Sequence, residues 1–136
     1  MTNSELIAKA ASVLRPKQIG KHLSADVGCA VLTNNGNVYT GVCIDTSGGM
    51  GFCAEQSAMA AMITAGEYKI EKIVAVWRNE EGTLFVGAPC GRCREFMRQV
   101  DEANLDTTVV LGIEKTVKLR ELLPEYEWWT ERVEGM

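Results

Sequence analysis

The spacing of hydrophobic residues along the first half of the chain predicts a helix, a hairpin and a second helix. Residues 3–14 repeat apolar side chains at helical intervals, with Asn3 or Ser4 able to cap the start and Pro16 beyond the end. Residues 26–45 contain two apolar runs on either side of NNGN, a sequence typical of the tight turn in an antiparallel hairpin. The stretch CAEQSAMAAMITAG is rich in strong helix formers and ends at a glycine suited to a helix C-terminus.

The second half of the chain continues this alternation of strands and helices. KIVAVW is an apolar run suited to a strand covered on both faces, and EEGT predicts a turn. CGRCREFMRQVDEAN then predicts a third helix, and TTVVLGI predicts another strand. This order indicates an α/β layered domain with a mixed sheet. With 136 residues and no repeat, linker or low-complexity tract, residues 1–136 are expected to form a single domain.

Charge and cysteine content narrow the partners and the compartment. The chain has 14 Lys and Arg against 18 Asp and Glu, a formal charge of −4 and no clear basic stripe. This balance disfavours a nucleic-acid polymer and favours a small neutral or cationic ligand. No stretch approaches the roughly 18 apolar residues of a membrane span, and the N-terminal residues lack a signal-peptide core. We therefore expect no membrane association and a cytoplasmic location, where a CxxC pair indicates metal or redox chemistry.

Three of the five cysteines fall at the starts of predicted helices. Cys53 begins the second helix, Cys90 begins the third, and Cys93 follows one turn later on the same face. Helix N-termini favour thiolates, the form of cysteine that binds metals, and zinc is the ion expected for such ligands. Three protein ligands leave a fourth position open, as in catalytic zinc sites. Glu55, two residues after Cys53, is placed to move protons at a water in that position.

The paired motifs CAE and PCGRC resemble the signature of the cytidine deaminase family of zinc nucleoside deaminases. Four longer segments look most like the blasticidin S deaminase branch: TGV at 40–42, SGGMGFCAE at 47–55, PCGRCREFM at 89–97 and LRELLP at 119–124.

This resemblance implies a three-layer α/β/α fold, zinc on Cys53, Cys90 and Cys93, and Glu55 as general acid and base. The carbonyl group of Ala88 is implied to accept a hydrogen bond from the amino group that is lost. The reaction implied is the hydrolytic deamination of cytidine, deoxycytidine or an analogue such as blasticidin S, with release of ammonia. Family members of this size also look like homotetramers that act on small nucleoside-like substrates.

Several positions depart from the cytidine deaminase pattern. The strand that normally reads Asn-x-Glu-Asn, and holds the sugar hydroxyl groups, is CIDT here. Cys43 cannot replace the amide, whereas Asp45 could accept a hydroxyl hydrogen bond with a shorter side chain. Ala25 stands where the family usually has an aromatic residue. The Arg that usually follows CAE is Gln56, and Arg92 within PCGRC is the candidate for the compensating positive charge.

Simpler interpretations and rival functions remain open at this point. Cys29 and Cys43 are also explained as small core residues, and His22, the only histidine, as an exposed residue. The tail tryptophans Trp128 and Trp129 could cover a hydrophobic edge or wall a neighbouring subunit's pocket. A structural zinc module would need a fourth ligand, and no further cysteine or histidine has suitable spacing. A redox protein would use the CxxC pair alone and would leave CAE unexplained.

Overall fold

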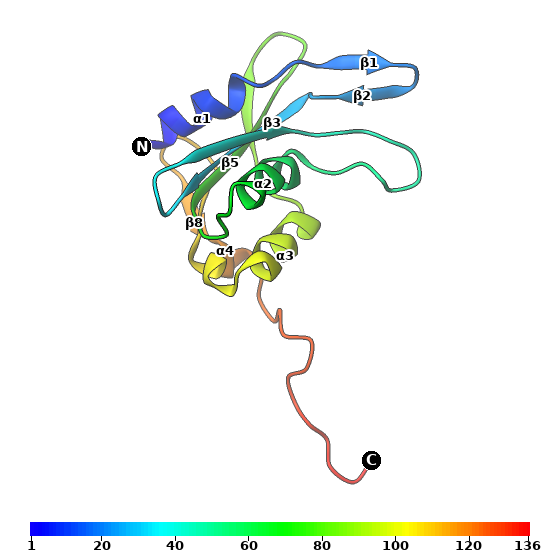
Figure 1. The fold of residues 1–136 in the computed structure, drawn as a ribbon, viewed down its shortest axis with the longest axis vertical. Helices are drawn as coiled ribbons and strands as arrows, with labels where there is room; N and C mark the ends of the chain where they lie inside the picture. Colours follow the sequence, from blue (N-terminus) through cyan, green and yellow to red (C-terminus); the bar gives the residue numbers. More distant parts are fainter.

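A six-stranded mixed sheet lies between helices on its two faces in the computed structural model, which describes residues 1–136 (Figure 1). The elements, in chain order, are α1 (Asn3–Ala11), β1 (Lys17–Ile19), β2 (His22–Ser24), β3 (Val27–Thr33), β4 (Val38–Val42), α2 (Ala54–Thr64), β5 (Ile70–Arg78), β6 (Leu84–Gly87), α3 (Gly91–Val100), the 3-10 helix η1 (Glu102–Asp106), β7 (Thr108–Val110), β8 (Thr116–Lys118) and α4 (Leu119–Leu122).

The sheet has the strand order β4-β3-β5-β7-β8, and β6 pairs with β5. The pairing of β5 with β7 is parallel, and all other pairs are antiparallel. One edge of β5 pairs with β3. The other edge pairs with β7 in its first half and with β6 in its second half. This confirms the mixed sheet expected from the sequence.

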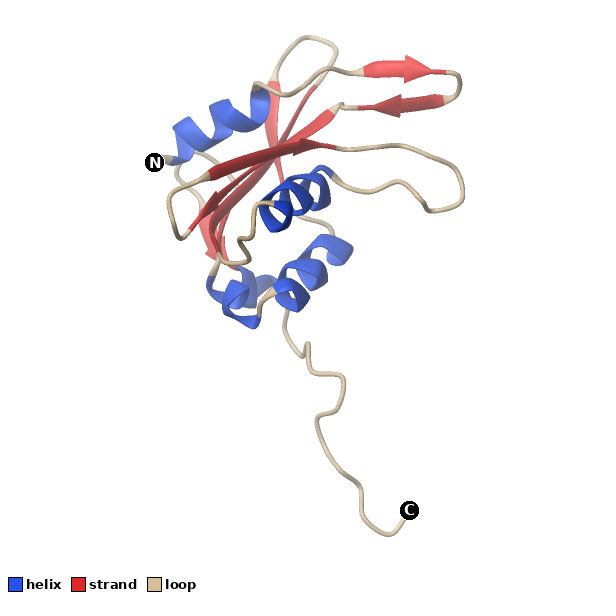
Figure 2. Ribbon diagram, viewed as in Figure 1, coloured by secondary structure: helices blue, strands red, loops and turns tan.

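Alternate residues of the central strands supply two separate hydrophobic cores. Ala30 and Leu32 of β3 pack with Leu6 and Ala10 of α1 on one face. Cys29 and Val31 point to the other face, where they join the buried methionines of α2 and α3, which are Met59, Met62 and Met97. Because a strand turns successive side chains to opposite faces, one apolar run serves both cores. The result is the three-layer α/β/α fold, with α1 alone on one side (Figure 2).

The contact between α2 and β4 depends on Gly41. A Cβ atom at this position would lie 2.3 Å from the backbone nitrogen of Ala58 and 2.6 Å from the Cβ atom of Ser57. Only a residue without a side chain lets the helix approach the strand this closely. The Ser57 hydroxyl group also donates a hydrogen bond to the carbonyl oxygen of Val42, at 2.7 Å. Both contacts fix the first two turns of α2 against the sheet.

Two helices end earlier than the sequence predicts. The first ends at Ala11 and is capped by Thr2, whose hydroxyl group accepts from the backbone N–H of Glu5, in place of Asn3 or Ser4. The third ends at Val100, because Asp101 is extended and its carboxylate caps the 3-10 helix that follows. The sequence pattern also missed the short strands β1, β2, β6 and β8, each of three or four residues.

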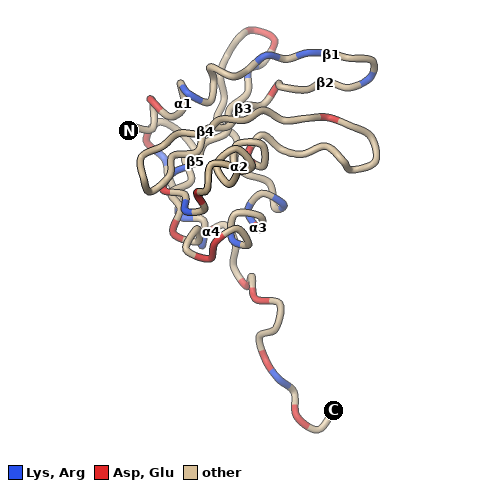
Figure 3. The backbone as a smooth tube through the Cα atoms, in the orientation of Figure 1, with Lys and Arg blue, Asp and Glu red and all other residues tan.

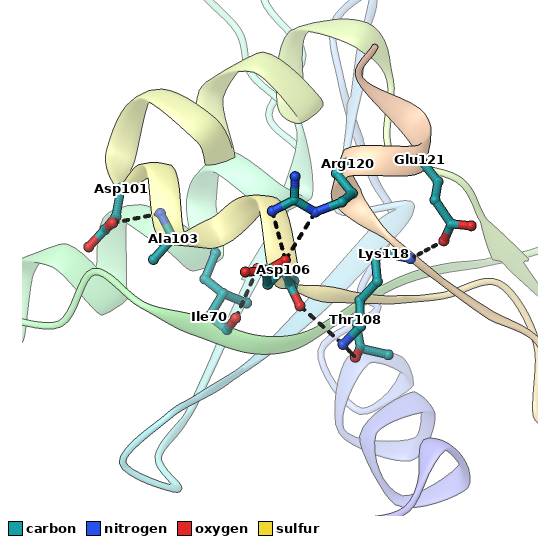
Figure 4. A network of polar contacts seen from close by, with 9 residues as sticks. Ile70, Asp101, Ala103, Asp106, Thr108, Lys118, Arg120 and Glu121 are labelled. Carbon is teal, nitrogen blue, oxygen red and sulfur yellow. Dashed lines mark hydrogen bonds and ion pairs between the residues drawn. The ribbon is translucent and has the colours of Figure 1, made fainter.

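The C-terminal part of the chain returns to the edge of the sheet before it leaves the body. The Asp106 carboxylate accepts two hydrogen bonds from the Arg120 guanidinium group, at 2.8 and 3.0 Å, and the Glu121 carboxylate accepts from the backbone N–H of Lys118 (Figure 4). Residues 124–136 then extend away from the layers as a tail without helix or strand (Figure 1). None of the helices combines the length and apolar character needed to cross a bilayer.

Candidate metal centre and active site

Three cysteine sulfur atoms converge where the N-termini of α2 and α3 meet. Cys53 is the N-cap residue of α2, Cys90 is the N-cap residue of α3, and Cys93 lies buried in the first turn of α3. The Sγ atoms of Cys53 and Cys90 are 3.6 Å apart, and all three Sγ atoms lie within 4.8 Å of one another. Tetrahedral zinc with bonds of about 2.3 Å separates its sulfur ligands by roughly 3.8 Å. The spacing therefore suits zinc.

The surroundings of the three thiol groups oppose their joint ionisation when no cation is bound. Burial raises the pKa of Cys53, and burial together with the charges of Glu55 and the other sulfurs raises that of Cys93. Burial also opposes ionisation of Cys90, but hydrogen bonds with Cys93 and Cys53 and the backbone of Arg92 lower its pKa. Three thiolates this close repel one another, so a cation is needed to hold all three in the metal-binding form.

Glu55 is a buried carboxylate beside this cluster. It lies in the first turn of α2 and is only 6% exposed. Burial raises the pKa of its carboxyl group, because the charged form loses its hydration. Such a group can hold a proton and release it at the site that it faces.

A cavity of about 290 Å³ opens onto the cluster and Glu55. Its wall includes Cys53 and Cys90 on the metal side and apolar residues of the sheet on the other, among them Val27, Ala75 and Trp77. The volume is at the lower end of the range of small-molecule sites, roughly 300 to 1,000 Å³. The cavity therefore has room for one small molecule next to the three sulfurs.

Two of the predicted substrate residues border this cavity. Ala88 lies in the loop between β6 and Cys90, and Cys43 lies just beyond β4. The Cys43 thiol donates a hydrogen bond to the Asp26 carboxylate at 2.9 Å and accepts one from the backbone N–H of Val27 at 3.4 Å. Burial, with the hydrogen bond to Asp26, raises the pKa of Cys43. Cys29, by contrast, is a fully buried core residue.

The other two predicted substrate residues border a different cavity. Asp45 and Ala25 line a hollow of about 460 Å³ together with residues of the β1–β2 hairpin. The Asp45 carboxylate lies 3.4 Å from Nδ1 of His22 and accepts a hydrogen bond from the backbone N–H of Leu23. Ala25 has φ of 63°, and its N–H donates to the carbonyl oxygen of Cys43. Within one chain, these two residues are not brought to the sulfur cluster.

Gln56, which replaces the family's usual arginine, and Arg92, which is predicted to supply the missing positive charge, both contact the backbone near the cysteine cluster. Gln56 is buried, and its side-chain oxygen accepts a hydrogen bond from the backbone N–H of Cys53 at 3.3 Å. Arg92 is exposed and donates to the carbonyl oxygen of Gly51 at 3.3 Å. The Arg92 contact ties the start of α3 to the loop that leads into Cys53. Both side chains therefore hold the backbone at or just before Cys53, one of the three candidate ligands.

Sequence reasoning missed the aromatic part of the cavity wall. Trp77 was expected inside a strand covered on both faces, but it is 42% exposed and borders the cavity. The expectation failed near the end of β5, where Trp77 belongs to neither hydrophobic core. The sequence signal that could have indicated this position was an aromatic residue at the end of an otherwise aliphatic strand.

The chain matches known proteins over most of its length. Residues 1–110 match the family model described as the cytidine and deoxycytidylate deaminase zinc-binding region. A cytidine deaminase of Mycoplasma genitalium is 30% identical over 94 residues, which are 68% of this chain and 69% of that protein. A probable cytidine deaminase of Dictyostelium discoideum is 35% identical over 71 residues, 52% of this chain and 46% of that protein.

Solved structures agree with this match. The cytidine deaminase of Burkholderia pseudomallei superimposes with a TM-score of 0.72 at 26% identity, over 92% of this chain and 98% of that chain. That of Mycobacterium leprae gives a TM-score of 0.72 at 22% identity, over 92% of this chain and all of that chain (100%). The expected three-layer fold and zinc-binding cysteine cluster are confirmed, and the chain belongs to the family of zinc-binding cytidine and deoxycytidylate deaminases.

Proposed function

We propose that residues 1–136 form one catalytic domain that hydrolytically deaminates a free cytosine nucleoside, cytidine or deoxycytidine, or an analogue such as blasticidin S. The exocyclic amino group is replaced by a carbonyl group, and ammonia is released. One observation carries this proposal: a carboxylate that is 6% exposed borders the same small cavity as the sulfurs of a zinc-binding cluster. A zinc site that only stabilises the fold needs neither the cavity nor the carboxylate.

The cysteines, Glu55 and Ala88 have different roles in the proposed reaction. Zinc, when bound by Cys53, Cys90 and Cys93, supplies Lewis-acid chemistry that activates a water molecule. Glu55 takes a proton from the attacking water, passes it to the ring nitrogen next to the reacting carbon, and then assists the departure of ammonia. Its burial favours this role, because a carboxyl group with a raised pKa holds a proton nearer to neutral pH. The carbonyl oxygen of Ala88 accepts a hydrogen bond from the amino group that leaves.

The substrate is a free small molecule and not a polymer. The cavity holds about 290 Å³, and basic and acidic positions are interspersed along the chain without a basic track (Figure 3). A nucleic-acid strand needs such a track along its backbone. We assign the protein to the cytoplasm, because its five cysteines form no disulfide and a reducing compartment keeps thiols available.

We further propose a homo-oligomer, a tetramer by family resemblance. The tail carries Trp128 and Trp129, which are 67% and 85% exposed, although the Arg98 guanidinium group lies over the Trp128 ring, 5.8 Å from its centroid. Within one chain the cavity also lacks a group that could hold a sugar hydroxyl, since Asp45 lies in a separate hollow. An aromatic tail from a neighbouring copy would close the site and bury these side chains.

The test is ammonia release from cytidine, deoxycytidine and blasticidin S, measured in parallel with zinc-loaded protein. Turnover of the two simple nucleosides would mean that another group replaces the missing sugar clamp. Turnover of blasticidin S alone would mean that CIDT and Ala25 mark a pocket reshaped for an analogue. No ammonia from any of the three would overturn the proposal and leave the zinc-binding interaction module as the better account.

A structural zinc module and a redox protein are less well supported. A structural zinc site is closed by four protein ligands, and the cluster contains three cysteines and no further cysteine or histidine. A redox protein would form a reversible disulfide between Cys90 and Cys93 and would bind no metal. It would also give no role to Cys53 and Glu55, which lie at the same site.

A further inference from the structure

Two aromatic side chains stack on each other beside the cavity. Trp77 of β5 and Phe85 of β6 have ring centroids 4.9 Å apart and ring planes inclined by 22°. They are directly opposite each other in the antiparallel pair, and both remain partly exposed to solvent, 42% and 41%. A stacked aromatic pair that stays this exposed offers apolar area to a partner outside the domain core.

Sheet pairing places this pair on the face of the cysteine cluster. Trp77 lies two residues after Ala75, so both point to the side of α2 and α3, where Ala75 joins the core beneath the cavity. Val27 of β3 is opposite Trp77 on the other edge and lines the same cavity. Trp77 therefore stands about 6.8 Å further out along the strand than Ala75.

Phe85 determines which part of the indole is available. The phenyl ring stacks on Trp77 but does not line the cavity, whereas Trp77 does. The indole is thus supported on the Phe85 side and open on the cavity side. A ring braced in this way loses little freedom when a ligand packs against it.

The two side chains predicted to contact the sugar are engaged in other interactions. Cys43 is engaged with Asp26 and the backbone of Val27, and Asp45 is engaged at the β1–β2 hairpin. Cys53, Cys90, Ala75 and Trp77 line one cavity, so we place the amino group of the ring at the cysteine cluster and its substituent against Ala75 and Trp77. The group carried by the heterocycle therefore meets an aromatic wall.

We propose that Trp77, braced by Phe85, is a specificity-determining residue that packs against the substituent on the substrate's heterocycle, in place of a polar clamp on sugar hydroxyl groups. The inference rests on the proposed deaminase function. The residue contributes to binding the substrate and takes no part in the proton transfers at Glu55. Selection among substrates then depends more on the area with which the substituent stacks on Trp77 than on the positions of its hydroxyl groups.

The test compares Trp77→Ala and Trp77→Phe with the wild type, on the substrate that the ammonia assay identifies. Loss of one stacking contact should raise KM about tenfold in Trp77→Ala and leave kcat within about twofold. Trp77→Phe should restore most of the binding, because it keeps an aromatic face. Tyr68→Ala is the matched control, since Tyr68 is 48% exposed and follows the opposite end of α2.

Fluorescence gives a readout that does not depend on turnover. The chain has three tryptophans, so a Trp128→Phe, Trp129→Phe variant leaves Trp77 as the only one. When this variant is titrated with the deaminated product, the fluorescence emission of Trp77 should change and then level off as the site becomes saturated. Unchanged kinetics in Trp77→Ala, or emission that responds to protein concentration and not to the product, would overturn the inference while the deaminase proposal stands. A wild type that releases no ammonia would remove both.

Discussion

The two ends of α2 each hold a glutamate, and their environments are opposite. Glu55 in the first turn is buried, and the pKa of its carboxyl group is raised because it loses hydration. Glu67, just past the C-terminal end, is partly exposed and accepts hydrogen bonds from the side chains of Tyr39, Asn37 and Asn35. These donors, Tyr39 first, lower the pKa of Glu67 to about 2.

The contrast separates a residue that we propose for chemistry from one that stabilises the structure. Burying a carboxylate destabilises the fold, so the burial of Glu55 beside three sulfurs supports the function that we propose for it. A carboxylate with three donors ties the β3–β4 turn to the end of α2. Cavity size does not distinguish the two ends, because a hollow of about 310 Å³ borders Glu67 as well. The chemistry of the residues that line each hollow does distinguish the two ends.

The same substitution at both ends should give the largest difference in activity. Glu55→Gln keeps the shape of the side chain and removes the proton carrier, so ammonia release should fall by about 100-fold or more. Zinc content should remain, since Glu55 is not among the clustered ligands. Glu67→Gln is the matched control and should stay within about twofold. Equal activity of the two variants would remove the special role of Glu55.

Gly41→Ala tests whether the position of the α2 N-terminus depends on its close contact with β4. The added Cβ atom would meet backbone atoms of Ser57 and Ala58, so we expect a loss of about 3 kcal/mol in the free energy of unfolding. Zinc affinity should fall with it, because Cys53 begins the same helix. Denaturant unfolding and metal titration measure the two effects.

Gly112→Ala is the control for that experiment. Its added Cβ atom would make only an ordinary contact, 3.7 Å from the Cβ atom of Lys115. Equal destabilisation by the two substitutions would show that the tight helix–strand contact is not what matters.

Arg92→Ala should have a smaller effect on the metal site. Its guanidinium group ties the loop before Cys53 to α3 and adds positive charge between two cysteine ligands. We expect zinc affinity to fall about tenfold, as measured by competition with a chelator. Arg120→Ala, which breaks an ion pair with Asp106 away from the cluster, should leave zinc affinity unchanged. An Arg92 variant with wild-type affinity would contradict the charge-balance role.

Glu67→Gln should give the smallest effect, seen in the pH dependence of stability. Because the folded pKa of Glu67 is about 2, below its ordinary value of 4.5, its contribution is complete above pH 4.5 and is lost as the pH falls toward 2. The melting temperature of the variant should therefore be lower than that of the wild type at pH 7. The gap should close between about pH 4.5 and 2. Glu80→Gln, in an exposed turn, should show no such gap.

The sequence predicted the parts of this molecule that depend on local signals. The cysteines and Glu55 were placed at helix starts because helix formers follow them directly, and the structure has Cys53 and Cys90 as N-cap residues. The hairpin turn at Gly36 and the helix end at Gly66 were also correct, since both positions have positive φ, at 84° and 89°.

Features that depend on pairing between distant segments could not be predicted. Asp45 and Ala25 lie at the β1–β2 hairpin, whose three-residue strands are too short to give an alternating pattern. The position of Trp77 at the cavity follows from the register of β5 against β3 and β6. Such registers are set by tertiary packing.

The most direct test of the account measures bound zinc and ammonia release in the same samples of the wild type and of Cys90→Ala. Cys90 supplies one of the three clustered sulfurs. We predict about one zinc ion per wild-type chain, ammonia release in proportion to zinc, and loss of both in the variant. Ammonia release that persists without zinc, or a zinc-loaded wild type that releases none from any of the three candidate substrates, would contradict the account.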